Sequence, residues 1–109
     1  KLNFDNNIER DRIVFIKKQI PINSNLITQW LYVDLFSEYQ KLHFYTRVLN
    51  NPQYTYIFLD LNQPYLDIDT QNANQKNSDI ANLKSLVNAG KFKTLIDNGR
   101  YLLLYCQSK

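Results

Sequence analysis

Apolar and polar residues alternate through much of the chain, with a period of two that is typical of β-strands. The clearest predicted strand covers residues 54–61, where Tyr56 and Phe58 fall on one face. Ile57 and Leu59 fall on the other face, so both faces are apolar. Because such a strand needs a covering layer on each side, we expect it to lie centrally in a sheet.

Four other segments show weaker strand patterns. Residues 12–20 have a strongly apolar middle, and residues 65–70 form a more exposed strand after a turn. Residues 91–96 and 100–106 flank an Asn-Gly turn, which is a strong hairpin signal when it lies between two alternating segments. We therefore expect the chain to end in an antiparallel pair.

The stretch 26–49 fits two descriptions. Apolar residues recur in it at three- and four-residue steps, which suits one long amphipathic helix. The dense aromatic and β-branched residues of its first half favour instead a strand over 28–36, followed by a helix over 38–49. We prefer the second description and leave the first open.

One helix is specified in more detail, over residues 79–88. Asn77 or Ser78 is its expected N-cap, and Gly90 supplies its C-terminal stop. The polar segment 71–77 before it is predicted to be a loop. The apolar stripe of this helix comprises Ile80, Leu83, Leu86 and Val87.

These elements predict a mainly β protein, namely a small antiparallel β-sandwich with two short helical insertions; an α+β arrangement is the alternative. Residues 1–10 are polar and are expected to form an extended lead-in or tether, whereas residues 11–109 form a single globular domain. A chain of 109 residues can bury a core without disulfides or metals. Eight Tyr and six Phe agree with a sheet-rich fold, because aromatic residues favour strands.

The apolar runs of the chain are short. None approaches the roughly 20 residues that a membrane helix needs, so we expect this part of the protein to be soluble. The sequence begins with Lys1 and contains no Met. We interpret this as removal of a preceding segment, which would be a secretory or lipoprotein signal, a membrane anchor or another domain.

Candidate catalytic residues are few. The chain has one His and one Cys, so a nucleophilic triad needs His43 to meet Cys106 or a serine. A zinc site needs more His or Cys ligands than the chain has, and two glycines cannot build a phosphate-binding loop. We therefore predict that the protein is not an enzyme and takes no cofactor or metal.

The acidic residues Asp60, Asp67 and Asp69 form the only carboxylate cluster in the sequence. Paired carboxylates bind Ca²⁺ or serve as acid and base, but the calcium-loop pattern with its central Gly is missing here. We interpret the three as a solvated strand face. A hydrolytic enzyme built on them is the third-ranked hypothesis.

The net charge of +3 is too small to indicate nucleic acid by itself. If basic strands converge beside Tyr and Phe rings, they make a surface for single-stranded nucleic acid, so a nucleic-acid-binding regulatory domain is the alternative function. Otherwise these basic residues protect exposed strand edges. They are Lys17, Lys18, Lys91, Lys93 and Arg100.

Aromatic residues are concentrated in the second quarter of the chain. They either fill the core or form a protein-binding face, because Trp and Tyr are favoured interface anchors. The set comprises Trp30, Tyr32, Phe36, Tyr39, Phe44 and Tyr45.

Four features in a fixed order support a family resemblance. They are an Asn-containing loop at 22–25, a Tyr-bearing strand at 30–36, a Phe-containing helical segment at 44–49 and an apolar closing strand at 101–105. In this order the chain resembles the type VI secretion outer-membrane lipoprotein family, although it lacks the Gly-rich turns of that family.

The resemblance implies a transthyretin-like sandwich, tethered by a lipid anchor at the periplasmic face of the outer membrane. It implies a non-enzymatic adaptor of a bacterial secretion apparatus, which binds a larger inner-membrane protein and no small-molecule substrate. The residues expected to contact this protein partner are Asn23, Asn25, Trp30, Gln71, Asn72 and Asn74.

Overall fold

The computed structural model describes residues 7–46, 54–67 and 72–106, which fold into three helices and five strands. The elements in chain order are α1 (Asn7–Lys18), β1 (Asn25–Thr28), the 3-10 helix η1 (Trp30–Phe36), β2 (Lys41–Phe44), β3 (Thr55–Asp60), α2 (Ala73–Asn88), β4 (Lys93–Asp97) and β5 (Tyr101–Cys106).

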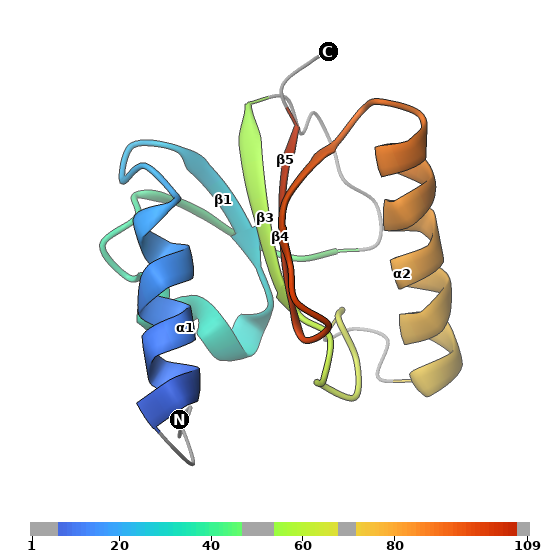
Figure 1. The fold of residues 1–109 in the computed structure, drawn as a ribbon, viewed down its shortest axis with the longest axis horizontal. Helices are drawn as coiled ribbons and strands as arrows, with labels where there is room; N and C mark the ends of the chain where they lie inside the picture. The colour runs from blue at the N-terminus through green and yellow to red at the C-terminus, as the bar shows by residue number, and fades with distance from the viewer. Residues whose placement is uncertain (1–6, 47–53, 68–71, 107–109) are drawn as a thin grey trace.

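The five strands form one mixed sheet in the order β2-β1-β3-β5-β4. β1 pairs in parallel with both β2 and β3, whereas β5 pairs in antiparallel fashion with β3 and β4. Figure 1 shows α1 and η1 on one face of the sheet and α2 on the other. The strand predicted from residues 54–61 is β3, and its central place in the sheet is confirmed.

The predicted sandwich is wrong. The chain is α+β, with one sheet between helices and 39% of the described residues helical. The apolar faces of β3 need cover on both sides, and helices supply it in place of a second sheet. The parallel pairs of β1 also exclude a purely antiparallel arrangement. The α+β alternative is the one that the structure supports.

The predicted strand over 12–20 is helix α1 for most of its length. Ile13, Ile16 and Ile20 are buried at helical spacing, while Phe15 is 60% exposed. The apolar residues of this run are therefore distributed around a helix, and they do not form the two faces of a strand. Lys17 and Lys18 in the last turn also favour a helix, because cations there interact favourably with the negative end of the helix dipole.

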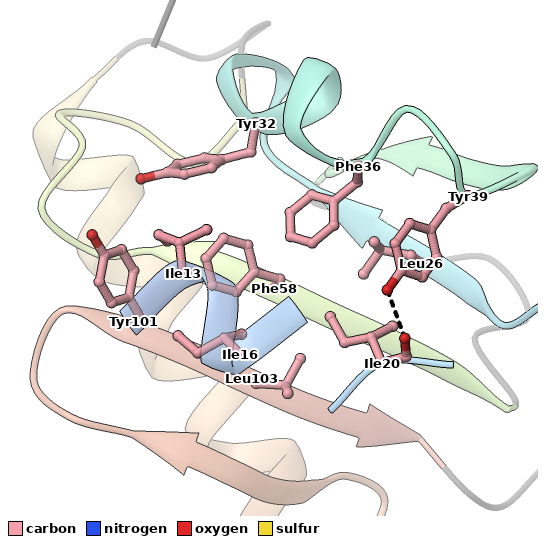
Figure 2. Packing of buried hydrophobic residues seen from close by; sticks show 10 residues of the cluster. All are labelled: Ile13, Ile16, Ile20, Leu26, Tyr32, Phe36, Tyr39, Phe58, Tyr101 and Leu103. Carbon is pink, nitrogen blue, oxygen red and sulfur yellow. Dashed lines mark hydrogen bonds between the residues drawn. The ribbon is translucent and has the colours of Figure 1, made fainter. Parts of the chain in front are cut away.

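Neither description of residues 26–49 is correct. β1 ends at Thr28, the chain then forms η1, and β2 occupies part of the predicted helix; residues 47–49 lie outside the described residues. Tyr32 and Phe36 are fully buried, and they anchor η1 on the sheet. Tyr39, just after η1, donates from its hydroxyl to the Ile20 carbonyl at 2.6 Å (Figure 2).

The C-terminal part of the chain agrees best with the prediction. α2 includes the predicted helix and ends before Gly90, whose φ of 80° needs glycine. It begins earlier than expected, because the Asn72 side chain caps it by accepting from the N–H groups of Asn74 and Gln75, so residues 73–77 are helical and do not form a loop.

The β4–β5 hairpin is confirmed, with Gly99 at a φ of 89° in its turn. Of the predicted strand at 65–70, residues 65–67 are not in a strand and 68–70 lie outside the described residues.

Two apolar cores lie on opposite faces of the sheet. The core under α1 and η1, drawn in Figure 2, comprises Ile13, Ile16, Ile20, Leu26, Tyr32, Phe36, Tyr39, Phe58, Tyr101 and Leu103. The core under α2 comprises Ile27, Tyr45, Ile57, Leu59, Leu66, Leu83, Phe92, Leu102, Leu104 and Cys106.

Candidate functional site

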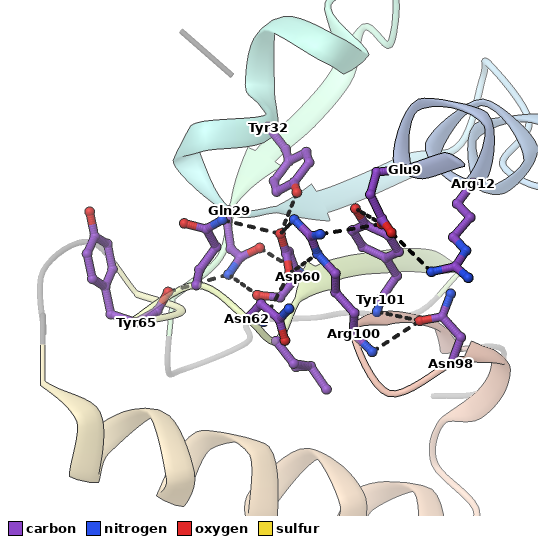
Figure 3. A network of polar contacts seen from close by, with 12 residues as sticks. Glu9, Arg12, Gln29, Tyr32, Asp60, Asn62, Tyr65, Asn98, Arg100 and Tyr101 are labelled. Atoms are coloured by element: carbon purple, nitrogen blue, oxygen red, sulfur yellow. Dashed lines mark hydrogen bonds and ion pairs between the residues drawn. The ribbon is translucent and has the colours of Figure 1, made fainter. Parts of the chain in front are cut away.

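Asp60, the last residue of β3, carries a buried carboxylate that accepts hydrogen bonds from several surrounding residues (Figure 3). Asp60 is fully buried, and its Oδ2 accepts from the Tyr32 hydroxyl at 2.6 Å. Arg100 donates from Nε to Oδ1 and from Nη2 to Oδ2, both at 3.2 Å. The Asn62 N–H and the Gln63 side-chain amide complete the set at 3.0 and 3.2 Å. With five donors, Asp60 has no oxygen left for substrate.

The electrostatics keep this carboxylate ionised. Burial alone raises the pKa of Asp60, but the hydrogen bonds from Arg100, Tyr32, Asn62 and Gln63 outweigh it, so the pKa lies below its ordinary value. The hydrogen bond with Asp60 raises the pKa of Arg100. Burial and the bond to Asp60 raise the pKa of Tyr32, which stays a protonated donor.

Acidification is therefore expected to weaken the fold through Asp60. Because the folded pKa is lowered, the stabilisation is complete above the unfolded pKa of about 4 and is lost as the pH falls through the folded pKa. We expect the urea midpoint to drop between about pH 7 and pH 3, and to drop less in Asp60→Asn. Equal drops in both proteins would show that Asp60 does not carry the acid sensitivity.

The network continues to the start of α1. Glu9 accepts from the Tyr101 hydroxyl at 2.9 Å and pairs with Arg100 at 3.4 Å and Arg12 at 3.1 Å. The Arg100 guanidinium also lies over the Tyr101 ring, 4.9 Å from its centroid. Burial, followed by the bond to Glu9, raises the pKa of Tyr101 to about 12. These contacts hold the first turn of α1 against the end of the sheet at which Asp60 lies.

Gln29 links the C-terminal ends of the parallel strands β1 and β3. It is 4% exposed and follows the last residue of β1. Its Oε1 accepts from the Asp60 N–H at 2.7 Å, and its Nε2 donates to the carbonyls of Asp60 at 3.0 Å and Tyr65 at 3.4 Å. The side chain thus makes the hydrogen bonds to Asp60 that the backbone of β1 would make if the strand continued. Its bond to the Tyr65 carbonyl also holds the segment after β3 in place.

Replacing Gln29 with Leu is expected to lower the free energy of unfolding by about 1–3 kcal/mol, because it leaves the buried N–H and C=O of Asp60 without these partners. Urea unfolding measures the change. Gln40→Leu is the matched control at an exposed position, where we expect less than about 0.5 kcal/mol. Similar losses in the two variants would contradict the role given to Gln29.

The two strands joined by Gln29 lead to opposite faces of the sheet. β1 continues into η1 on the α1 face, whereas β3 continues toward α2 on the other face (Figure 1). Chains that leave adjacent parallel strands in opposite directions open a crevice at the carboxyl ends of those strands, where open α/β sheets bind their ligands. A hollow of about 190 Å³ lies there. Its lining residues, the switch-point crevice, are Gln29, Trp30, Leu31, Gln63, Pro64, Tyr65 and Leu66.

The crevice presents aromatic and uncharged polar groups to solvent. Trp30, the only Trp of the chain, is 56% exposed. Figure 3 shows the Tyr65 side chain extending away from Asp60. Among the residues that the structure describes, no charged side chain lines the hollow. Its chemistry therefore suits a small neutral group.

Of the predicted partner-binding residues, only Trp30 lines this crevice. Asn23 precedes β1 and Asn25 begins it, so both lie at the opposite end of the strand from Trp30. Asn72 and Asn74 belong to the capped start of α2, and residue 71 lies outside the described residues. The prediction therefore found one residue of the crevice and missed Gln29, Gln63 and Tyr65. The signal for Gln29 was a polar residue directly after a buried apolar strand.

The alternative chemistries are not assembled in the described residues. His43 is exposed on edge strand β2, whereas Cys106 is buried on β5, three strand spacings of about 4.8 Å away. Asp60 and Asp67 are both buried, which corrects the solvated-face interpretation, and residue 69 is not described. No group of three His, Cys, Asp or Glu in the described ranges is placed to hold a metal ion.

The predicted basic surface does not form as one patch. Lys17 pairs with Glu38 at 2.6 Å, and Arg100 is committed to Asp60. Lys93 is exposed on edge strand β4. Within the described part of the chain, no helix is long and apolar enough to span a membrane.

Comparison with known proteins adds no relative. No family model matches the chain. No curated protein matches it either, and neither does any solved structure.

Proposed function

We propose that this chain is a non-catalytic recognition domain whose switch-point crevice binds a small, uncharged group. The observation that carries the proposal is the position of the hollow, at the carboxyl ends of β1 and β3 where the chain leaves to opposite faces. The exposed Trp30 at its edge adds a residue type that is favoured as a binding anchor.

The chemistry around the crevice supports binding without catalysis. Asp60, which is hydrogen-bonded to the lining residues Gln29 and Gln63, has its oxygens filled by donors and is held ionised, so it has neither a proton to give nor a free lone pair. Tyr32 is a protonated donor that is already committed to Asp60. These groups shape and stiffen the base of the crevice, which favours recognition by a preformed site.

The adaptor role expected from the sequence is one form of this function, because a protein partner can present the bound group. Trp30 belongs to both hypotheses. The proposed secretion apparatus and outer-membrane location depended on a transthyretin-like sandwich, and the observed sheet removes that support. They stay predictions from the resemblance, and nucleic-acid binding stays a prediction from the basic and aromatic residues of the strands.

A fragment screen followed by ¹H–¹⁵N NMR tests the proposal. We expect neutral fragments to shift the Trp30 indole N–H and the amides of Gln63 and Tyr65, and charged fragments of the same size to shift them less. Phe44→Ala is the control, since Phe44 is also an exposed aromatic residue, at 51%, but lies on β2. It should leave the shifts unchanged, whereas Trp30→Ala should remove them. Fragments that gather elsewhere on the protein would contradict the proposal.

A further inference from the structure

We infer that the ligand of the switch-point crevice is a neutral saccharide, with one sugar ring lying against the indole of Trp30. The inference rests on the proposed function and names the class of ligand for that site. It follows from the size of the hollow, from the hydrogen-bonding groups that its lining leaves unpaired, and from the absence of charge on the lining residues that the structure describes.

The hollow is small. Its volume of about 190 Å³ lies below the 300–1,000 Å³ that is typical of pockets for drug-sized ligands. An α-helix, about 10–12 Å across with its side chains, does not fit. A single six-membered ring does, while the rest of an oligosaccharide chain extends into solvent.

Three polar groups of the lining have no hydrogen-bond partner within the described ranges. They are the Trp30 indole N–H, the Tyr65 hydroxyl and the Gln63 side-chain oxygen. The hydrogen bonds of Tyr65 and Gln63 involve other atoms, and Trp30 makes no side-chain hydrogen bond to another described residue. The first only donates, the last only accepts, and the hydroxyl does both. A ligand must therefore offer both donors and acceptors at short spacing, as the hydroxyl groups of a sugar do.

The exposed face of the Trp30 ring suits the less polar, C–H-bearing face of a sugar ring. The negative face of an aromatic ring attracts polarised C–H groups, which a pyranose ring presents on its less polar face. Trp30 is more than half exposed, so its ring is available for this contact. The described residues of the lining carry no charge to pair with a carboxylate or phosphate, so an uncharged sugar fits better than a uronic acid or a sugar phosphate.

A proline-rich peptide is the main competitor, because such peptides also bind aromatic surfaces. Polyproline offers backbone carbonyls and no N–H, so it would leave the Gln63 oxygen unmatched. It also needs a groove long enough for successive residues, whereas this hollow has a volume of only about 190 Å³. The crevice therefore favours the saccharide.

The test titrates the intact chain and follows the fluorescence of Trp30, the only Trp and hence a probe inside the site. The probes are the tetramers of glucose and N-acetylglucosamine in β-1,4 linkage, mannotetraose, tetragalacturonate and a decaproline peptide. We expect a saturable change with at least one neutral sugar and a change at least about tenfold weaker in affinity with tetragalacturonate. Calorimetry then compares variants: Trp30→Phe should retain binding and Trp30→Ala should lose about tenfold or more. Phe44→Ala should bind as the unmodified chain does.

The outcomes separate the two proposals. If decaproline or neutral fragments bind in the crevice and no sugar does, the saccharide inference is overturned while the proposed function stands. If neither sugars, peptide nor fragments perturb Trp30 in the folded protein, both are overturned. Sugar binding that survives Trp30→Ala would place the saccharide elsewhere and overturn the inference as well.

Discussion

Replacing Asp60 with Asn is expected to lower the free energy of unfolding by about 3 kcal/mol. Removing one partner of a buried ion pair leaves an uncompensated charge, which costs about 3–5 kcal/mol. The lower end applies here, because Arg100 is 30% exposed and keeps its contact with Glu9. Tyr32 also loses the charged acceptor of its 2.6 Å hydrogen bond.

Urea unfolding at pH 7 measures this loss. Asp34→Asn is the matched control, because Asp34 is exposed on η1 and the substitution makes the same charge change; we expect less than about 0.5 kcal/mol. The double variant Asp60→Asn with Arg100→Gln should lose less than the sum of the two single changes, since the first change already breaks the pair. Strict additivity would show that the two side chains act independently.

Parts of the fold were predictable because their signals are local. The hairpin turn needs glycine at a positive φ, which Gly99 supplies, and α2 carries a complete apolar stripe and a glycine stop at Gly90. The two apolar faces of β3 correctly placed it in the centre of the sheet. The error was to cover those faces with another sheet.

Other parts depend on contacts that no local pattern shows. Val14 and Phe15 are exposed on α1 although they stand in an apolar run, so this run resembles a buried strand. The turn into η1 places Tyr32 over Asp60, a contact between residues 28 positions apart. Composition favours strands in both segments, and tertiary packing overrides it.

The candidate site shows the same limit. Trp30 was predictable as an aromatic residue that a small domain has difficulty burying. The roles of Asp60 and Gln29 were not, because they depend on β1 and β3 being parallel neighbours, and parallel pairing is not visible in either strand alone. The crevice exists only because the two strands lead to opposite faces, which is a property of the topology.

Replacing Phe58 with Ala is expected to lower the free energy of unfolding by about 3–5 kcal/mol, the usual cost of truncating a buried Phe. Phe58 lies on β3 two residues before Asp60 and on the same face. Its ring centroid is 5.3 Å from that of Tyr32 and 5.5 Å from that of Phe36, so it is one of the contacts through which the sheet supports η1. The Tyr101 ring stacks on it, with the two ring centroids 5.8 Å apart.

This substitution also connects the core to the crevice. η1 begins at Trp30, so loss of the ring beneath it should loosen the position of the indole. We expect a lower fluorescence anisotropy of Trp30 in the folded variant and weaker ligand binding, together with the lower urea midpoint. Phe15→Ala makes the same chemical change at a side chain that is 60% exposed, and it should change the stability by less than about 0.5 kcal/mol and leave the anisotropy alone. If Phe58→Ala destabilises the protein and the anisotropy of Trp30 stays constant, η1 is held by its other contacts and the crevice does not depend on this part of the core.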